Sequence, residues 1–206
     1  KLNSTATIHD NVILDTKGPG IMVYGATELS RESVVERNFV AGSRTSSAIV
    51  VGGGPAILRN NVAITSAEAG IGLENYGRRE LLRGIVVAHN TVYGNVRGGI
   101  LIPAEGRLDV KILNNAAHAQ PGTPAFPTGQ MGVLNSGNVD CSSLPCFVDP
   151  HARDFSPLAI GPGSLVGARW LPLDDYFGRR RGVPPTVGAI EQPAGPIPLG
   201  IKAVRP

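Results

Sequence analysis

The chain has 206 residues, of which 42% are apolar and 17% are charged, and its net charge is +3. These values fit one folded domain with a core and exclude a disordered polyelectrolyte. No run reaches the roughly 18 apolar residues of a membrane-spanning helix, and the small, scattered positive charge does not predict a nucleic-acid partner.

An asparagine recurs at near-regular intervals from the start of the chain, with spacings of 27, 23, 29 and 25 residues. An apolar residue lies three positions before each asparagine, and another lies two positions after it. Repeats of this length are typical of solenoids, in which each coil buries its apolar face against its neighbours. The five segments are Thr7–Asn11, Val34–Asn38, Ile57–Asn61, Val86–Asn90 and Lys111–Asn115.

A second motif lies between successive asparagines and consists of a small residue followed by alternating apolar positions. Alternation over so few residues predicts short strands separated by turns, and no run has the length of a helix. Strands stacked about 4.8 Å apart would align equivalent isoleucines and valines in internal columns. The copies are Gly20–Val23, Ala48–Val51, Gly70–Leu73 and Gly99–Ile102, with a weaker one at Met131–Leu134.

Two motifs in fixed phase favour a parallel β-helix over an antiparallel sandwich with coincidental asparagine turns. A corner between strands needs a residue that tolerates the left-handed conformation, and asparagine does so. Stacked side-chain amides can also hydrogen-bond to one another in a ladder. We therefore expect residues 1–140 to form an all-β solenoid of about five to six coils. The predicted structural residues are Asn11, Asn38, Asn61, Asn90 and Asn115. The repeat begins almost at Lys1, which predicts further coils or another chain at that end.

Charged and aromatic residues follow the second motif in two neighbouring coils. Arginine can bind a carboxylate through two parallel hydrogen bonds, and tyrosine can stack on a sugar ring. We take these residues as a candidate binding site for an acidic sugar; a solvated surface is the alternative. The residues are Glu74, Tyr76, Arg78, Glu105 and Arg107.

The outward positions of the same strands are apolar or bare. A strip of this kind is typical of a surface that packs under a loop or against a protein partner. It favours a second function, in which the solenoid is a non-catalytic scaffold for assembly. The strip consists of Met22, Val50, Gly72 and Leu101.

The remainder of the chain does not repeat. Cys141 and Cys146 are close enough in sequence to form a disulfide, which would suit an oxidising compartment, and two free thiols are the alternative. Two cysteines alone do not complete a zinc site, so no metal is predicted there. Residues 141–191 are expected to cap the last open edge of the solenoid, and residues 192–206 to form an extended, proline-rich tail.

The phased units of residues 4–118 resemble the secreted right-handed β-helix repeat proteins, which share their fold with pectate lyases and related polysaccharide lyases. The closing residues are similar to the final segment of many bacterial members, although Leu165 departs from the usual continuation after Gly-Ser. These closing motifs are Phe147–Pro150, Asp154–Phe155, Gly161–Ser164, Asp175–Arg181 and Val187–Glu191.

The resemblance implies a protein that is secreted, periplasmic or on the surface of a bacterial cell. It also implies binding of an acidic polysaccharide, with cleavage by β-elimination if the chain is an enzyme. A base would then remove a proton next to the sugar carboxylate while a cation neutralises the developing charge. No cofactor is expected, with Ca²⁺ as the alternative if the chain is a lyase. Asp174 and Asp175 alone do not provide the six or more oxygens that this ion prefers.

Overall fold

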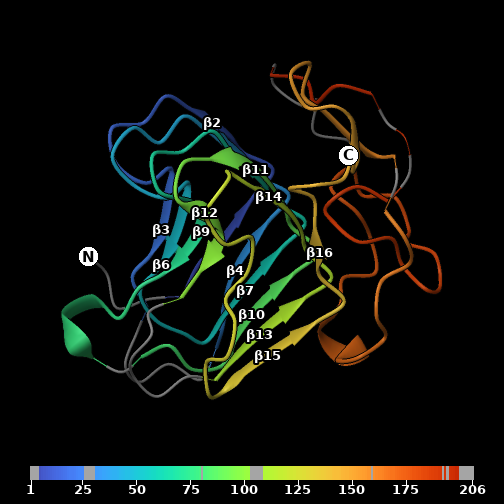
Figure 1. Cartoon of the computed structure of the whole chain (residues 1–206). Coiled ribbons are helices and arrows are strands. Elements are labelled where there is room, and N and C mark those ends of the chain that lie inside the picture. The colour runs from blue at the N-terminus through green and yellow to red at the C-terminus, as the bar shows by residue number, and fades with distance from the viewer. Residues whose placement is uncertain are drawn as a thin grey trace.

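The computed structural model describes residues 5–25, 31–79, 81–102, 109–158, 160–191, 193 and 195–199. The chain winds into stacked coils whose strands form three parallel sheets, which we call A, B and C (Figure 1). Sheets A and B contain six strands each, and sheet C contains four. The predicted all-β parallel solenoid is confirmed.

Within each sheet the strands stack in chain order, one from each coil. Sheet A contains β1 (Thr7–His9), β4 (Ser33–Glu36), β7 (Ala56–Arg59), β10 (Ile85–Ala88), β13 (Val110–Leu113) and β15 (Val133–Ser136). Sheet B contains β2 (Val12–Leu14), β5 (Phe39–Ala41), β8 (Val62–Ile64), β11 (Thr91–Asn95), β14 (Ala116–Ala119) and β16 (Val139–Asp140). Sheet C contains β3 (Ile21–Val23), β6 (Ile49–Val51), β9 (Ala69–Leu73) and β12 (Gly98–Leu101).

The predicted internal columns are confirmed. In sheet C, Ile49 pairs with Ile21 on one side and with Ile71 on the other, and Ile71 pairs with Ile100. These side chains join the inward residues of sheets A and B in one apolar core. The small residue before each isoleucine is explained by this core, because a methyl group on Gly70 would collide with Val92 of sheet B.

The weaker copy predicted at Met131–Leu134 is wrong. Val133 and Leu134 belong to sheet A, where they pair with Val110 and Lys111. The next position beyond sheet C is taken instead by Pro124 and Ala125, whose carbonyls accept hydrogen bonds from the backbone of Gly99 and Ile100. The alternation at 131–134 is real, but periodicity alone does not assign a strand to one of three sheets.

The asparagines of the repeat stack in a ladder at the corner between sheets A and B, as predicted. The backbone N–H and the side-chain amide of each one donate to the Oδ1 atom of the next; for Asn61 and Asn90 both distances are 2.9 Å. The second amide hydrogen reaches a backbone carbonyl, as from Asn61 to Val35 at 2.8 Å. A sixth member, Asn138, accepts the same bonds from Asn115.

The left-handed residue of each corner is not the ladder asparagine, contrary to the prediction. It is the residue before it, with φ between 51° and 56° in the first five corners. The ladder asparagine can therefore turn its side-chain amide inward. These residues are Asp10, Arg37, Asn60, His89 and Asn114, followed by Gly137 with φ 67° in the sixth corner.

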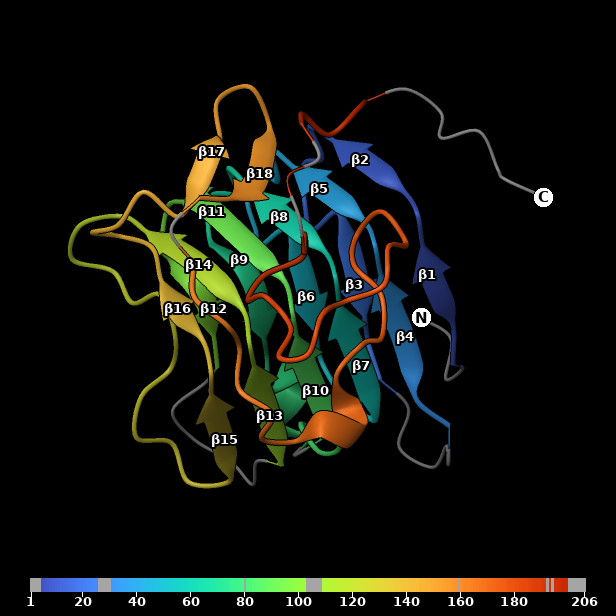
Figure 2. The ribbon, with the colours of Figure 1, turned by 90° about the vertical axis from the view of Figure 1, so that its right-hand side faces the viewer.

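The segment 141–191, which we call the closing segment, lies along the side of the solenoid, whereas the sequence predicted a cap on its end (Figures 1 and 2). Its apolar residues cover the outer face of sheet B, where Phe155, Tyr176 and Ile190 are each 1% exposed. Trp170, in the short 3₁₀ helix η2 (Ala168–Trp170), packs on the outer face of sheet A. The end of the core is contacted instead by Ala125 and Phe126.

Corner side chains hold the closing segment in place. Asn114 donates to the carbonyl of Ser164 and accepts from its N–H, both at 2.8 Å. Asn60 donates to the carbonyl of Asp174 at 2.8 Å and accepts from Arg181 at 2.7 Å. Two of the motifs that resemble the end of bacterial β-helix proteins, Gly161–Ser164 and Asp175–Arg181, therefore make structural contacts with the corners.

Two ion pairs of the closing segment involve buried carboxylates. Arg181 Nη1 lies 2.9 Å from Glu191 Oε2, and the two side chains are 2% and 6% exposed. The fully buried carboxylate of Asp175 accepts from Arg179 at 2.7 Å and from the N–H of Glu191 at 3.1 Å. Each of these buried carboxylates therefore has an arginine partner, which avoids the high cost of burying a charge alone. Of the predicted tail, residues 193 and 195–199 are described, and Ile197 is fully buried in the cluster over sheet B.

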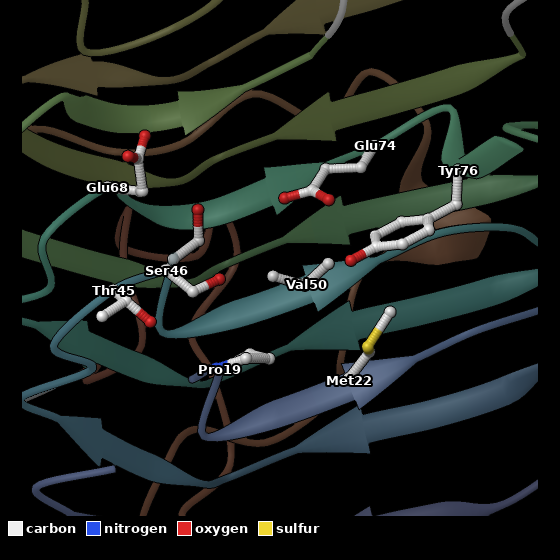
Figure 3. Close-up of a pocket in the computed structure, with 9 residues that line it drawn as sticks. Pro19, Met22, Thr45, Ser46, Val50, Glu68, Glu74 and Tyr76 are labelled. Atoms are coloured by element: carbon white, nitrogen blue, oxygen red, sulfur yellow. The ribbon is translucent and has the colours of Figure 1, made fainter. Parts of the chain in front are cut away.

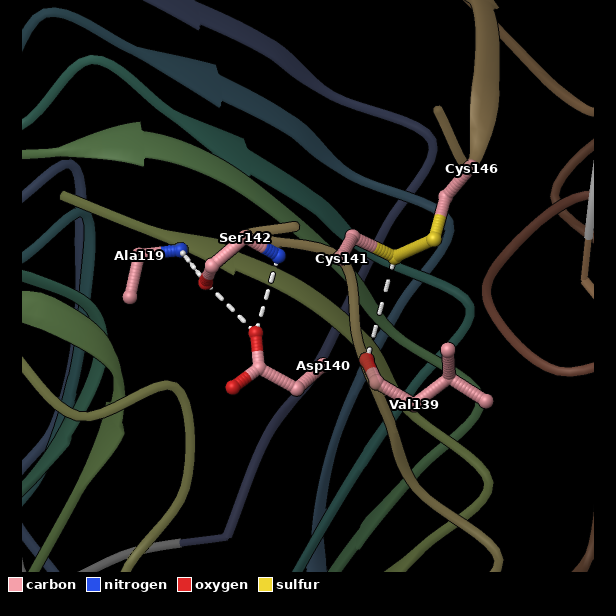
Figure 4. Close-up of a disulfide and its surroundings, with 6 residues drawn as sticks. All are labelled: Ala119, Val139, Asp140, Cys141, Ser142 and Cys146. Atoms are coloured by element: carbon pink, nitrogen blue, oxygen red, sulfur yellow. Dashed lines mark hydrogen bonds between the residues drawn. A yellow bond between two sulfur atoms is a disulfide. The ribbon is translucent and has the colours of Figure 1, made fainter. Parts of the chain in front are cut away.

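The predicted disulfide is present. Cys141 follows β16 and Cys146 precedes β17 (Phe147–Asp149), which pairs in antiparallel fashion with β18 (Asp154–Pro157). The disulfide thus joins the last coil to the first hairpin of the closing segment (Figure 4). Both cysteines are buried, and they pack in one cluster with Phe147 and Phe155.

Removing this disulfide is expected to lower the free energy of unfolding by about 2 kcal/mol, the chain-entropy value for so short a loop. The measurement is urea denaturation of the Cys141→Ala/Cys146→Ala variant beside the oxidised protein. Reductant should destabilise the native chain and leave the variant unchanged. Equal stability of the native chain with and without reductant would contradict this role.

The described residues contain no helix that is long and apolar enough to span a membrane.

Candidate functional site

A groove of about 330 Å³ lies on the outer face of sheet C. Its floor is formed by outward residues of β3 and β6, Met22 and Val50. Its walls come from the segments that enter and leave the strands of this sheet. The lining residues are Pro19, Met22, Thr45, Ser46, Ser47, Val50, Glu68, Glu74 and Tyr76.

The two walls differ in chemistry (Figure 3). Glu74 and Tyr76 follow β9 on one side, and the carboxylate of Glu74 and the hydroxyl of Tyr76 both point over Val50. Thr45, Ser46 and Glu68 lie on the opposite side, before β6 and β9. A ligand in the groove would therefore meet an aromatic ring from one side and hydroxyls from the other.

Gly72 leaves space for the polar groups of the site. A methyl group at this position would lie 2.7 Å from Ser47 Oγ and 3.8 Å from Glu74 Oε1. The Ser47 hydroxyl and the Glu74 carboxylate thus both lie beside the bare backbone of Gly72. Burial raises the pKa of the Glu74 carboxyl above its usual value, and the nearby carboxylate of Glu68 adds to this rise.

The predicted site residues are only partly brought together. Glu74 and Tyr76 line the groove, and Tyr76 is 41% exposed. Arg78 ends the 3₁₀ helix η1 (Tyr76–Arg78), is exposed, and is not among the lining residues. Glu105 and Arg107 lie outside the described residues.

The opposite wall was missed in the sequence. Ser47 directly precedes Ala48, the first residue of one copy of the second motif, and Glu68 lies two positions before Gly70, the first residue of the next copy. Counting backward from the motif, as well as forward, would have found them. Residues just before a strand and residues just after it lie at opposite edges of the same outer face of the sheet, so both can line one groove.

The groove is acidic among the residues described. Glu68 and Glu74 are the charged groups of its lining. Arg97 Nη1 lies 3.1 Å from Glu68 Oε2, in a pair that is exposed and therefore weak. Within the described ranges, no group of three or more His, Cys, Asp or Glu side chains is placed to hold a metal ion.

A second hollow, also of about 330 Å³, lies between the first corners and the closing segment. The guanidinium of Arg37 is engaged there by three carboxylates, those of Asp10 at 3.1 Å, Glu36 at 3.2 Å and Asp174 at 3.8 Å. These pairs raise the pKa of Arg37 and extend the contact between the closing segment and the coils. The hollow is best explained as part of that structural contact.

The family comparison agrees with the fold. Residues 1–141 match the family model described as the right handed beta helix region. No curated protein and no solved structure matches the chain. The matched range includes every coil strand of sheets A, B and C. This chain therefore belongs to the right-handed β-helix family.

Proposed function

We propose that this protein binds a neutral polysaccharide in the groove over sheet C. The observation that carries the proposal is the pairing of an exposed aromatic ring, Tyr76, with hydroxyl and carboxylate groups across an open groove. An aromatic ring packs against the apolar face of a sugar. Carboxylates accept hydrogen bonds from sugar hydroxyls, whereas side-chain hydroxyls both donate and accept them, and bonds to a charged acceptor are the stronger ones.

The charge of the groove decides between neutral and acidic sugars. The sequence predicted an acidic polysaccharide on the basis of arginines near Tyr76. In the described structure, Arg79 is turned toward backbone carbonyls and the lining carries the carboxylates of Glu68 and Glu74. A uronate would meet two like charges at short range, whereas a neutral sugar would not. We therefore favour the neutral class.

The proposal is limited to binding. In β-elimination a positive group offsets the charge that develops on the sugar carboxylate. The lining residues described do not supply an arginine or lysine for this task. The scaffold function has less support, because Val50 is 1% exposed and Gly72 is buried. The disulfide supports a location in an oxidising compartment, and we propose an extracytoplasmic one in a bacterium.

Affinity electrophoresis tests this function. The chain is run in native gels that contain hydroxyethylcellulose, laminarin, galactomannan or polygalacturonate. At least one neutral polymer should retard it, and polygalacturonate should retard it less. Tyr76→Ala should weaken binding by up to about tenfold, the value of an aromatic contact. Leu173→Ala, an exposed residue of the closing segment, is the control.

Two outcomes would count against the proposal. Strongest retardation by polygalacturonate would overturn the neutral class and restore the acidic sugar. Equal mobility in every gel would overturn polysaccharide binding itself for the polymers tested.

A further inference from the structure

Arg79 connects the segments that leave three successive strands of sheet C. Its Nε atom donates to the carbonyl of Tyr76 at 2.9 Å. Its Nη2 atom donates to the carbonyls of Tyr24 at 2.8 Å and Gly52 at 3.2 Å. The guanidinium also lies over the ring of Tyr24, 4.0 Å from the centroid. One side chain therefore joins the segments after β3, β6 and β9.

Gly52 provides the space in which Tyr76 lies. A methyl group on Gly52 would be 3.5 Å from Tyr76 Cβ and 3.6 Å from Tyr76 Cδ2. The base of the Tyr76 ring thus packs over bare backbone of the coil below its own. Its ring centroid is 5.9 Å from that of Tyr24, at an interplanar angle of 58°. Tyr76, which lines the groove, is therefore in ring contact with Tyr24 of the segment after β3.

The local segment does not supply this order by itself. η1 is a single 3₁₀ turn of three residues. Short 3₁₀ turns have poorer hydrogen-bond geometry than α-helices, and a single turn is marginal in isolation. Tyr76 also has 41% of its surface exposed, so packing leaves much of it free. The Arg79 side chain binds the carbonyl of Tyr76 and, through Nη2, the carbonyls of Tyr24 and Gly52, so it links the Tyr76 backbone to two neighbouring coils.

We propose that Arg79 is a positioning residue for Tyr76 in the polysaccharide groove. It acts through Tyr76, because its guanidinium is directed at carbonyls and at the Tyr24 ring. A ring that is already held in place loses less conformational entropy when a sugar stacks on it. This inference rests on the proposed function, and its test includes a measurement that needs no ligand.

The binding measurement compares Arg79→Met with Arg83→Met, a matched change at an exposed arginine of the same loop. Affinity is measured in gels of the neutral polymer that retards the native chain most. Arg79→Met should weaken binding by about three- to tenfold, the range of a stacking contact. Arg83→Met should bind like the native chain. Arg79→Lys should not restore affinity, because an ammonium lacks the planar fork that reaches three carbonyls.

The ligand-free measurement is ¹⁹F NMR of protein labelled with 3-fluorotyrosine, with the Tyr76 signal assigned from Tyr76→Phe. Arg79→Met should narrow this signal and move it toward its value in denatured protein, and Arg83→Met should not. Gly52→Val, which fills the space beneath the ring, should shift the same signal and weaken binding to a similar degree. Far-UV circular dichroism verifies that each variant keeps its coils.

The outcomes separate the two proposals. If the native chain binds none of the polymers but the Tyr76 signal responds to Arg79→Met, the polysaccharide function fails and the positioning role stands. If the signal is unchanged in Arg79→Met, the positioning role is overturned whatever the gels show. A loss of affinity in Arg79→Met that Arg79→Lys fully restores would also overturn it, since charge alone would then suffice.

Discussion

Asn90→Ala is expected to lower the free energy of unfolding by about 3–5 kcal/mol, because it removes several buried hydrogen bonds at once. The side chain of Asn90 accepts from the backbone and the amide of Asn61, both at 2.9 Å. It donates to Asn115 Oδ1 at 2.9 Å and to the carbonyl of Leu58 at 3.0 Å. Alanine would leave these groups in the core without partners, where each costs more than an unmade bond at the surface.

The same substitution at the end of the ladder is the control. Asn11 is exposed, and its amide donates to Asn38 Oδ1 and to the carbonyl of His9, both at 2.9 Å. Water can replace these partners, so Asn11→Ala should cost less than about 1 kcal/mol. Guanidinium denaturation followed by circular dichroism measures both variants. Equal losses at the two positions would show that burial of the ladder is not what stabilises it.

Acidification is expected to weaken the attachment of the closing segment through His89. This residue is fully buried, and burial together with Arg181 lowers its pKa to about 3. Its Nδ1 atom lies 3.1 Å from the carbonyl of Thr186, which can only accept, so this nitrogen carries the hydrogen. Its Nε2 atom faces the side-chain amide of Asn114 at 3.2 Å and accepts from it. A second proton on Nε2 would therefore point at the N–H donor of Asn114, and the positive charge on the ring would lie near the guanidinium of Arg181.

The direction of the effect follows from the two pKa values. In the unfolded chain His89 has its ordinary pKa of about 6.5, so between pH 6.5 and 3 the unfolded state binds the extra proton. The contribution of neutral His89 is complete above pH 6.5 and is lost as the pH falls toward 3, by roughly 3–5 kcal/mol in all. The stability of the attachment should therefore decline steadily over this range.

The measurement is the free energy of unfolding at several pH values between 7.5 and 4. In His89→Gln the slope should be smaller by up to about 1.4 kcal/mol per pH unit, the value for one proton. The glutamine variant is less stable at pH 7.5 but lacks this titration. Parallel pH profiles for the two proteins would contradict the assignment to His89, and other acidic groups would then account for the acid sensitivity.

The interior of the solenoid could be predicted from the sequence because its rules are local. Alternation places Ile49 inward, and the constant spacing places it beside Ile21 and Ile71. The ladder was predicted for the same reason, apart from Asn138. That residue was missed because Asn135 occupies the position that is apolar in the other coils, opposite Ile112.

The path of the closing segment could not be predicted, because its contacts are distant in sequence and do not repeat. Arg181 bonds Asn60 across 121 positions, and the residues between them give no periodic signal. The site was predicted in part for a related reason. Glu74 and Tyr76 follow the motif in register, but the direction of Arg79 depends on three loops whose shapes the sequence does not define.

The side-chain contacts between corners and closing segment have a mechanical consequence. In a solenoid with contacts between adjacent coils alone, stability is a sum of neighbour terms and the terminal coils fray first. Here the closing segment crosses several coils and is hydrogen-bonded to a corner residue in three of them, Asn60, His89 and Asn114. When force is applied to the two ends of the chain, the coils joined by the closing segment should unfold together in one abrupt step, and not one coil at a time.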